Sequence, residues 1–201
     1  MYTVYTKQYD SPPVDRREIL RYAGIRGEVS ELEILLDDCL LETLNKLSYR
    51  VCFCQFPLRE EGDALDLGFA VTESRDLKRH LAGCHHTVVF AATVGMELDR
   101  LIARYGYTSP LRALMLQAIG AERIEALCDR FCEELQEEMK ERGWKIGSRF
   151  SPGYGDLPLE TQSVLFQVLD CPRKIGLTLN ASLLMSPSKS VTALMGVSNE
   201  K

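Results

Sequence analysis

The stretch Thr87-Val88-Val89-Phe90-Ala91-Ala92-Thr93-Val94 is almost continuously apolar. Such a run predicts a strand that is buried on both faces, because a strand with one solvated face would alternate apolar and polar residues. Gly95 ends the run and leads into a helix that we expect over residues 97–104. Upstream, residues 49–56 and residues 65–71 are rich in β-prone side chains and predict two further strands.

The longest predicted helix begins at Ser109-Pro110, since serine is a favoured N-cap and proline fits the first helical position. Its periodic pattern continues to Arg142 and stops at Gly143. Gly120 lies inside this segment, where the apolar spacing slips, so we expect a kink or a break there. Shorter helices are predicted over residues 15–22, 32–47, 74–81 and 159–169, the first with Asp15 as its N-cap.

Two extended segments near the C-terminus indicate the fold class. Residues 176–185 and 191–197 flank a turn-forming stretch at 186–190, a pattern that predicts a β-hairpin. Antiparallel pairing of this kind, without regular alternation of strands and helices, is typical of α+β proteins. We therefore expect a single domain over residues 1–201, with mixed helices around a twisted, largely antiparallel sheet and an extended arm over residues 1–14.

The overall charge and hydropathy exclude several classes of partner. The 201-residue chain carries a formal net charge of −5, whereas nucleic-acid and anionic-membrane partners need a basic surface. We find no window of the ~18 apolar residues that a membrane span requires. The first residues also lack the basic and apolar segments of a signal peptide. We expect a soluble, cytoplasmic protein that binds neither nucleic acid nor membranes.

The seven cysteines predict buried thiols rather than disulfides or a metal site. Their number is odd, and no Cys-x-x-Cys motif occurs. Cys128 and Cys132 are four residues apart on the long predicted helix, so they share a face and suit a small, buried, apolar role. Cys84-His85-His86 is the densest group of potential ligands, but adjacent residues entering a strand point to opposite sides. We therefore expect no metal ion there.

The stretch Arg149-Phe150-Ser151-Pro152-Gly153-Tyr154-Gly155-Asp156 is the candidate binding loop. Proline fixes one dihedral angle and glycine permits conformations closed to other residues, so the loop can present Arg149, Tyr154 and backbone groups to a ligand. The alternative is an ordinary turn in which Arg149 pairs with Asp156 or with a helix acid. Glu125 lies at the edge of the apolar stripe of the long helix, where a carboxylate reaches water or faces a cleft.

Beyond this local chemistry, Arg149-Phe150-Ser151-Pro152-Gly153-Tyr154 resembles the Arg-x-(Ala/Ser)-Pro-Gly-Tyr signature of the activation domain of cobalamin-dependent methionine synthase. Residues 185–193 resemble the Met-x-Pro-x-x-Ser-Val-Ser-Gly stretch of that family, and residues 122–127 resemble the helix before the signature. The resemblance is specific over residues 120–197. Residues 19–27 and 90–95 resemble separately encoded relatives of the domain.

The resemblance implies a module that binds S-adenosylmethionine and supports the reductive methylation of cob(II)alamin. The corrinoid would be carried by a methionine synthase module acting as partner, and a flavodoxin- or ferredoxin-like protein would donate the electron. The implied ligand-binding residues are Arg149, Ser151, Gly153, Tyr154 and Glu125, although the alignment also permits Ala126 at the helix position. No side chain is implied as a catalytic acid, base or nucleophile, because the cofactors carry the methyl transfer.

Two other functions remain open at this point. A non-catalytic module could keep the fold and dock on a corrinoid protein without using the sulfonium ligand. A module of the same kind could also reactivate another corrinoid methyltransferase. All three functions place the chain in a methyltransferase system, and the family's own system belongs to methionine biosynthesis.

Overall fold

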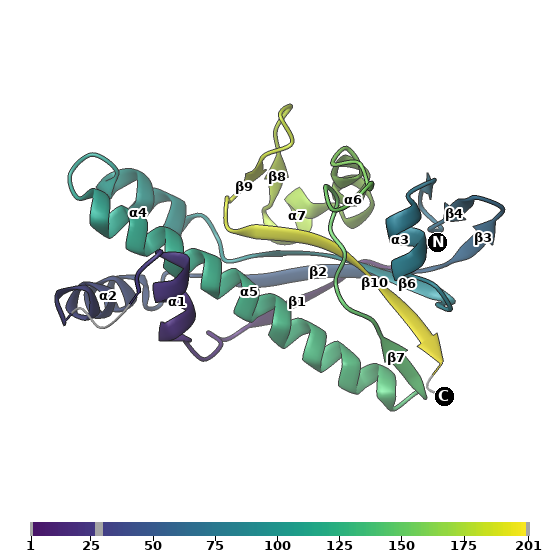
Figure 1. Ribbon diagram of the computed structural model, residues 1–201, viewed down its shortest axis with the longest axis horizontal. Helices are drawn as coiled ribbons and strands as arrows, with labels where there is room; N and C mark the ends of the chain where they lie inside the picture. Colours follow the sequence, from purple (N-terminus) through teal and green to yellow (C-terminus); the bar gives the residue numbers. More distant parts are fainter. Residues whose placement is uncertain (1, 27–29, 200–201) are drawn as a thin grey trace.

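The computed structural model describes residues 2–26 and 30–199 and is built around one antiparallel sheet of five strands, in the order β1-β2-β6-β10-β7 (Figure 1). The predicted α+β class with helices around a largely antiparallel sheet is confirmed. The central strand, β6, contains most of the predicted apolar stretch, and Val88, Val89, Phe90, Ala91 and Ala92 are all fully buried. The five strands are β1 (Tyr5–Tyr9), β2 (Tyr49–Pro57), β6 (His86–Thr93), β10 (Ser190–Asn199) and β7 (Trp144–Ile146).

One face of the sheet packs against the long helix α5 (Pro110–Lys140). Phe131 of this helix contacts the rings of Phe53 and Phe90, with centroids 5.2 and 5.0 Å away. In Figure 1, α5 runs diagonally across the lower part of the view. Three shorter helices complete this layer: α1 (Arg16–Tyr22), α2 (Ser30–Thr43) and α4 (Glu97–Tyr105).

The opposite face of the sheet carries a second apolar core, to which Cys52, Val89 and Leu194 contribute from the strands. Because neighbouring residues of β6 point to opposite faces, Val89 and Phe90 belong to different cores. The elements over this face are α3 (Arg75–His80), α6 (Thr161–Leu169), α7 (Cys171–Ile175) and the small sheet of β3 (Arg59–Glu61), β4 (Ala64–Asp66) and β5 (Val71–Thr72).

Of the kink or break predicted at Gly120, the break is wrong, because α5 continues without interruption through that residue. The glycine is explained by packing instead. A Cβ atom at Gly120 would overlap the Leu98 side chain of α4 and would come within 2.8 Å of Lys189 Cγ. Gly120 therefore lets α4 and the segment before β10 approach the helix backbone closely.

The predicted C-terminal hairpin is also wrong in its pairing. The two short strands β8 (Thr178–Leu179) and β9 (Met185–Ser186) pair with each other, while β10 pairs with β6 and β7. The reason is burial: Ala193, Leu194 and Met195 have no exposed surface, so this strand belongs inside the main sheet.

Local turns change two other predictions. The strand expected over residues 65–71 is divided between β4 and β5 by a turn at Gly68, whose φ is 78°. Asp170, with φ 49°, ends α6 near the predicted stop, but a further helix, α7, follows directly with Pro172 in its first turn. Both interruptions depend on residues in the left-handed region, where glycine and aspartate are tolerated.

An ion pair inside α5 fixes the N-terminal segment. Arg123 is 2% exposed and donates to the Glu122 carboxylate and to the carbonyl oxygens of Pro12 and Pro13, each 2.6 Å away. Glu122 in turn accepts a hydrogen bond of 3.0 Å from the backbone N–H of Asp15, the observed N-cap of α1. The pair thus satisfies backbone groups of the chain between β1 and α1.

We expect Arg123→Met to lower the free energy of unfolding by about 3–5 kcal/mol, because it leaves the Glu122 carboxylate buried without its counter-charge. Urea denaturation at pH 7 measures this effect. The exposed Arg130 of the same helix provides the matched control, since Arg130→Met removes an arginine without burying a charge. The double variant Arg123→Met/Glu122→Gln should recover part of the lost stability. An Arg123→Met variant as stable as Arg130→Met would contradict the stabilising role of the ion pair.

Candidate functional site

The candidate loop begins as an extension of the sheet beside β10. The backbone of Gly147 bonds to Gly196, and Phe150 forms an antiparallel bridge with Leu194. Ile146 pairs with Val197, and Phe150 pairs with Leu194. Between these two pairs the loop segment advances four residues, while β10 advances only three. One extra residue is therefore accommodated as a bulge, a feature that redirects neighbouring side chains.

Arg149 and Phe150 consequently point to opposite layers of the molecule. Phe150 packs in the core beneath α3, with its ring centroid 5.0 Å from that of His80. The guanidinium of Arg149 instead reaches α5, where its Nη2 lies 3.0 Å from Glu125 Oε2 and 2.9 Å from Asp129 Oδ1. The bulge thus places one loop residue in each layer.

The Arg149 cluster, defined here as Arg149, Glu125 and Asp129, lies at the boundary of the molecule. The side chains are 26%, 42% and 63% exposed, respectively, so the guanidinium is the most enclosed group. Both contacts use Nη2, and the described hydrogen bonds leave the N–H groups of Nε and Nη1 for other acceptors. A further anionic group would therefore have to reach Nε or Nη1, or displace one of the two acids from Nη2.

Two thiols lie near the guanidinium, and both stay protonated at neutral pH. Burial raises the pKa of Cys128 far above its usual range, and Arg149 offsets this only in part. Burial likewise raises the pKa of Cys132 to about 11, again against the opposing effect of Arg149. Cys132 Sγ also lies 3.5 Å from Met195 Sδ of β10. Neither sulfur supplies the thiolate that nucleophilic chemistry needs.

The loop itself is closed by its own backbone. The N–H of Gly153 donates to Leu157 O (2.9 Å), and the N–H of Tyr154 donates to Ser151 O (3.1 Å). Gly153 has φ 90°, a value that L side chains rarely adopt, and Gly155 leaves room for the Asp76 carboxylate, which any Cβ there would overlap. The backbone hydrogen bonds close the loop, and the two glycines supply the positive φ values that this closed conformation needs.

Asp156 anchors the end of the loop to the first turn of α3. Its carboxylate accepts hydrogen bonds from the Ser74 hydroxyl and from the backbone N–H groups of Arg75 (2.8 Å) and Asp76 (3.2 Å). The Ser74 hydrogen bond, followed by the two backbone bonds, lowers the pKa of Asp156 below its ordinary value of 3.8. Of the two alternatives for Arg149, pairing with helix acids is observed and pairing with Asp156 is not.

We expect Asp156→Ala to lower the urea midpoint at pH 7, because the loop loses its attachment to α3. A carboxylate whose pKa is depressed by folding stabilises the protein above its unfolded pKa and loses that contribution as the pH falls through the folded value. The difference from the unmodified protein should therefore be constant near neutrality and shrink below pH ~4. Asp63→Ala, at an exposed hairpin turn, is the control. A difference that persists unchanged at pH 3 would contradict the assigned role.

Tyr154 projects from the loop with 63% of its surface exposed. Its ring meets the edge of Phe150 at a centroid distance of 6.3 Å, and His80 accompanies this pair, with Nε2 2.8 Å from Ser148 O. A shallow cavity of about 420 Å³ adjoins these aromatic rings and is lined by Asp76, Arg79, His80, Phe150 and Gly155. The exposed phenol ring is thus available to a ligand or a partner surface.

The structure brings together only part of the predicted set. Arg149 and Glu125 are in contact, while Ser151, Gly153 and Tyr154 share the loop. Within the described residues, no hydrogen bond or ion pair joins Tyr154 to the Arg149 cluster. Sequence reasoning missed Asp129, which the spacing of four residues from Glu125 on a helix could have indicated.

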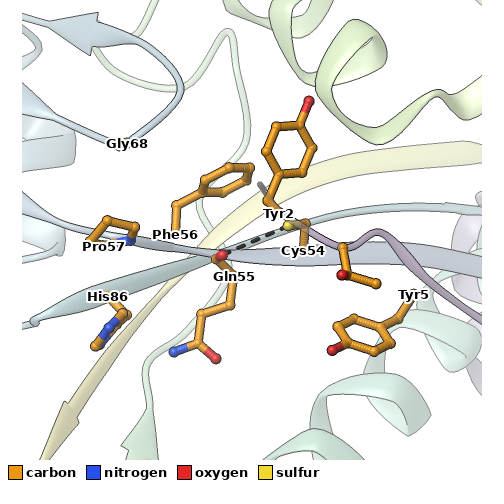
Figure 2. A pocket seen from close by; sticks show the side chains of 9 residues that line it. Tyr2, Tyr5, Cys54, Gln55, Phe56, Pro57, Gly68 and His86 are labelled. Atoms are coloured by element: carbon orange, nitrogen blue, oxygen red, sulfur yellow. Dashed lines mark hydrogen bonds between the residues drawn. The ribbon is translucent and has the colours of Figure 1, made fainter.

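A second cavity lies at the edge of the sheet, away from the loop in sequence. It measures about 540 Å³, and Figure 2 shows its aromatic wall with Tyr2 beside Phe56, whose ring centroids are 5.0 Å apart. Its lining includes no residue of the loop or of α5. Over residues 2–26 and 30–199, no group of three or more His, Cys, Asp or Glu side chains is arranged to hold a metal ion.

These features define an α+β domain in which a Pro-Gly loop places an arginine against a long helix. The family of the activation domain of vitamin B12-dependent methionine synthase matches residues 77–201, more than half of the chain, and the chain belongs to this family. A similar fold occurs in a crystal structure of the MetH reactivation domain bound to AdoHcy, with a TM-score of 0.66 and 18% identity. That similarity covers 96% of this chain and 78% of the other. No curated protein sequence matches.

None of the helices in the described part of the chain is long and apolar enough to cross a membrane.

Proposed function

We propose that this chain binds S-adenosylmethionine through the Arg149 cluster and the adjoining loop, and supports reductive remethylation of cob(II)alamin on a partner methionine synthase module. Membership of the activation-domain family supports this function. The observation in the structure that carries it is the partly exposed guanidinium of Arg149, which the loop holds against α5 and whose hydrogen bonds to Glu125 and Asp129 use Nη2 alone.

The residues suit the chemistry of this ligand. An arginine recognises the amino-acid carboxylate of S-adenosylmethionine, and Glu125 offers the opposite charge to its sulfonium or ammonium group. The exposed ring of Tyr154 attracts cations through its face. A Cβ atom at Gly153 would lie 3.3 Å from Leu159 Cδ1, so glycine avoids crowding on that side of the loop. The sulfonium supplies the methyl group, and the protein's part is to bind and orient it.

The remaining components would come from partners. A corrinoid-binding methionine synthase module would present the cobalt, and a flavodoxin- or ferredoxin-like protein would donate the electron. Residues 1–201 would act as one domain in this assembly. The side chains of the loop would hold the ligand still while the corrinoid approaches, which is catalysis by positioning rather than by acid–base groups.

A docking module that does not use the ligand is the second candidate. The observation that favours it is the pairing of Arg149 with two carboxylates of α5, since an arginine already paired can have a purely structural role. In that case the exposed Tyr154 would contact the partner surface instead of the ligand.

We expect Arg149→Ala to abolish binding of S-adenosylmethionine in isothermal titration calorimetry, because the ligand carboxylate loses its counter-charge. The thermal midpoint should change little, since partly exposed ion pairs contribute roughly 0–1 kcal/mol each. Arg130→Ala, at an exposed position of α5, is the matched control and should bind as the unmodified chain does.

Three outcomes separate the candidates. Loss of binding with a folded variant supports the proposed pocket. Binding that survives Arg149→Ala places the ligand elsewhere, and a variant that fails to fold assigns Arg149 a structural role. A chain that binds no ligand, yet associates with a corrinoid protein in sedimentation, supports the docking module.

A further inference from the structure

We propose that Asp129 competes with the ligand carboxylate for Arg149, so that it sets both the affinity of the site and its selectivity for ligands that carry a carboxylate. This inference rests on the proposed function. Asp129 is the most exposed member of the Arg149 cluster, at 63%, and its Oδ1 lies 2.9 Å from Nη2.

The competition follows from the geometry of a guanidinium. A carboxylate can engage arginine with two parallel hydrogen bonds either side-on, through Nε and Nη2, or end-on, through Nη1 and Nη2. Both arrangements include Nη2, and the remaining side is blocked by the methylene chain. In the structure, Nη2 is the nitrogen that Glu125 and Asp129 share. Nη2 carries two N–H groups, and each of the two arrangements needs one of them. When Glu125 and Asp129 each accept one of these N–H groups, a ligand carboxylate can form two bonds only if one of the acids withdraws.

Asp129 is the acid that leaves more readily. The two carboxylates are one helical turn apart on α5, but Glu125 is 42% exposed and Asp129 is 63% exposed. An ion pair that is more open to water is more strongly screened and gives less stabilisation. Asp129 can return to solvent at little cost, while Glu125 stays beside the positively charged part of the ligand. The departing aspartate is then replaced by the carboxylate of the ligand.

In this arrangement, only a ligand with a carboxylate can replace Asp129 at Arg149. A ligand with a sulfonium and an ammonium but no carboxylate gains nothing from displacing Asp129. For such a ligand, Asp129 would instead add a favourable negative charge. The two kinds of ligand should therefore respond differently to loss of the aspartate charge.

The test compares S-adenosylmethionine with decarboxylated S-adenosylmethionine, which keeps both positive groups. Calorimetry on the full chain and on Asp129→Asn should show that S-adenosylmethionine binds about two- to fivefold more tightly to the variant, the range expected for an exposed ion pair. The affinity for the decarboxylated compound should stay equal or fall. Glu133→Gln removes an exposed acid one turn further along α5 and is the control for a general charge effect.

Weaker or unchanged binding of S-adenosylmethionine to Asp129→Asn overturns the inference, even if the unmodified chain binds the ligand and the proposed function stands. An equal gain for both compounds, or an equal gain in Glu133→Gln, also overturns it. Binding that is seen only in Asp129→Asn supports the inference in its strongest form. If neither protein binds the ligand, the proposed function and this inference both fail.

Discussion

The burial of β6 on both faces is the constraint on which the rest of the structure depends. A strand without a solvated face requires an apolar layer on either side, and the described residues form two apolar cores, one on each face of the sheet. Phe90 turns toward Phe131 of α5, and Val89 turns toward the core beneath α6 and α7. β10 pairs with β6 along its length, so the burial of β6 also determines where β10 lies and therefore which strand the loop follows.

The candidate site is a consequence of that edge. The segment after β7 follows β10, gains one residue in a bulge and then turns away, so Arg149 joins α5 while Phe150 joins the opposite core. The loop is therefore held by both layers rather than by one. Pairing with Glu125 and Asp129 orients the guanidinium of Arg149 against α5.

Features that depend on neighbours along the chain could be predicted from the sequence. The buried run at Thr87–Val94 follows from local periodicity, and the Asp15 cap from its side-chain hydrogen bonds to the first turn of α1. The start of α5 follows from the fit of Pro110 to the first helical position, since the Ser109 side chain makes no capping hydrogen bond. Features that depend on contacts between distant segments could not be predicted from the sequence. Gly120 signalled a helix break by its propensity, but its cause is the approach of Leu98 and Lys189. The pairing of β10 with β6, not with the preceding segment, depends on which strand can bury its apolar residues most fully.

Asp156 has a further consequence for recognition. Its carboxylate secures the end of the loop on α3, while Arg149 secures the beginning on α5. A flexible loop would lose conformational entropy each time it closed on a ligand, and that loss would subtract from affinity. Here the ordering is completed once, when the chain folds. If a ligand binds beside Arg149 as proposed, it meets a loop that is already ordered, and none of its binding free energy is spent on ordering that loop.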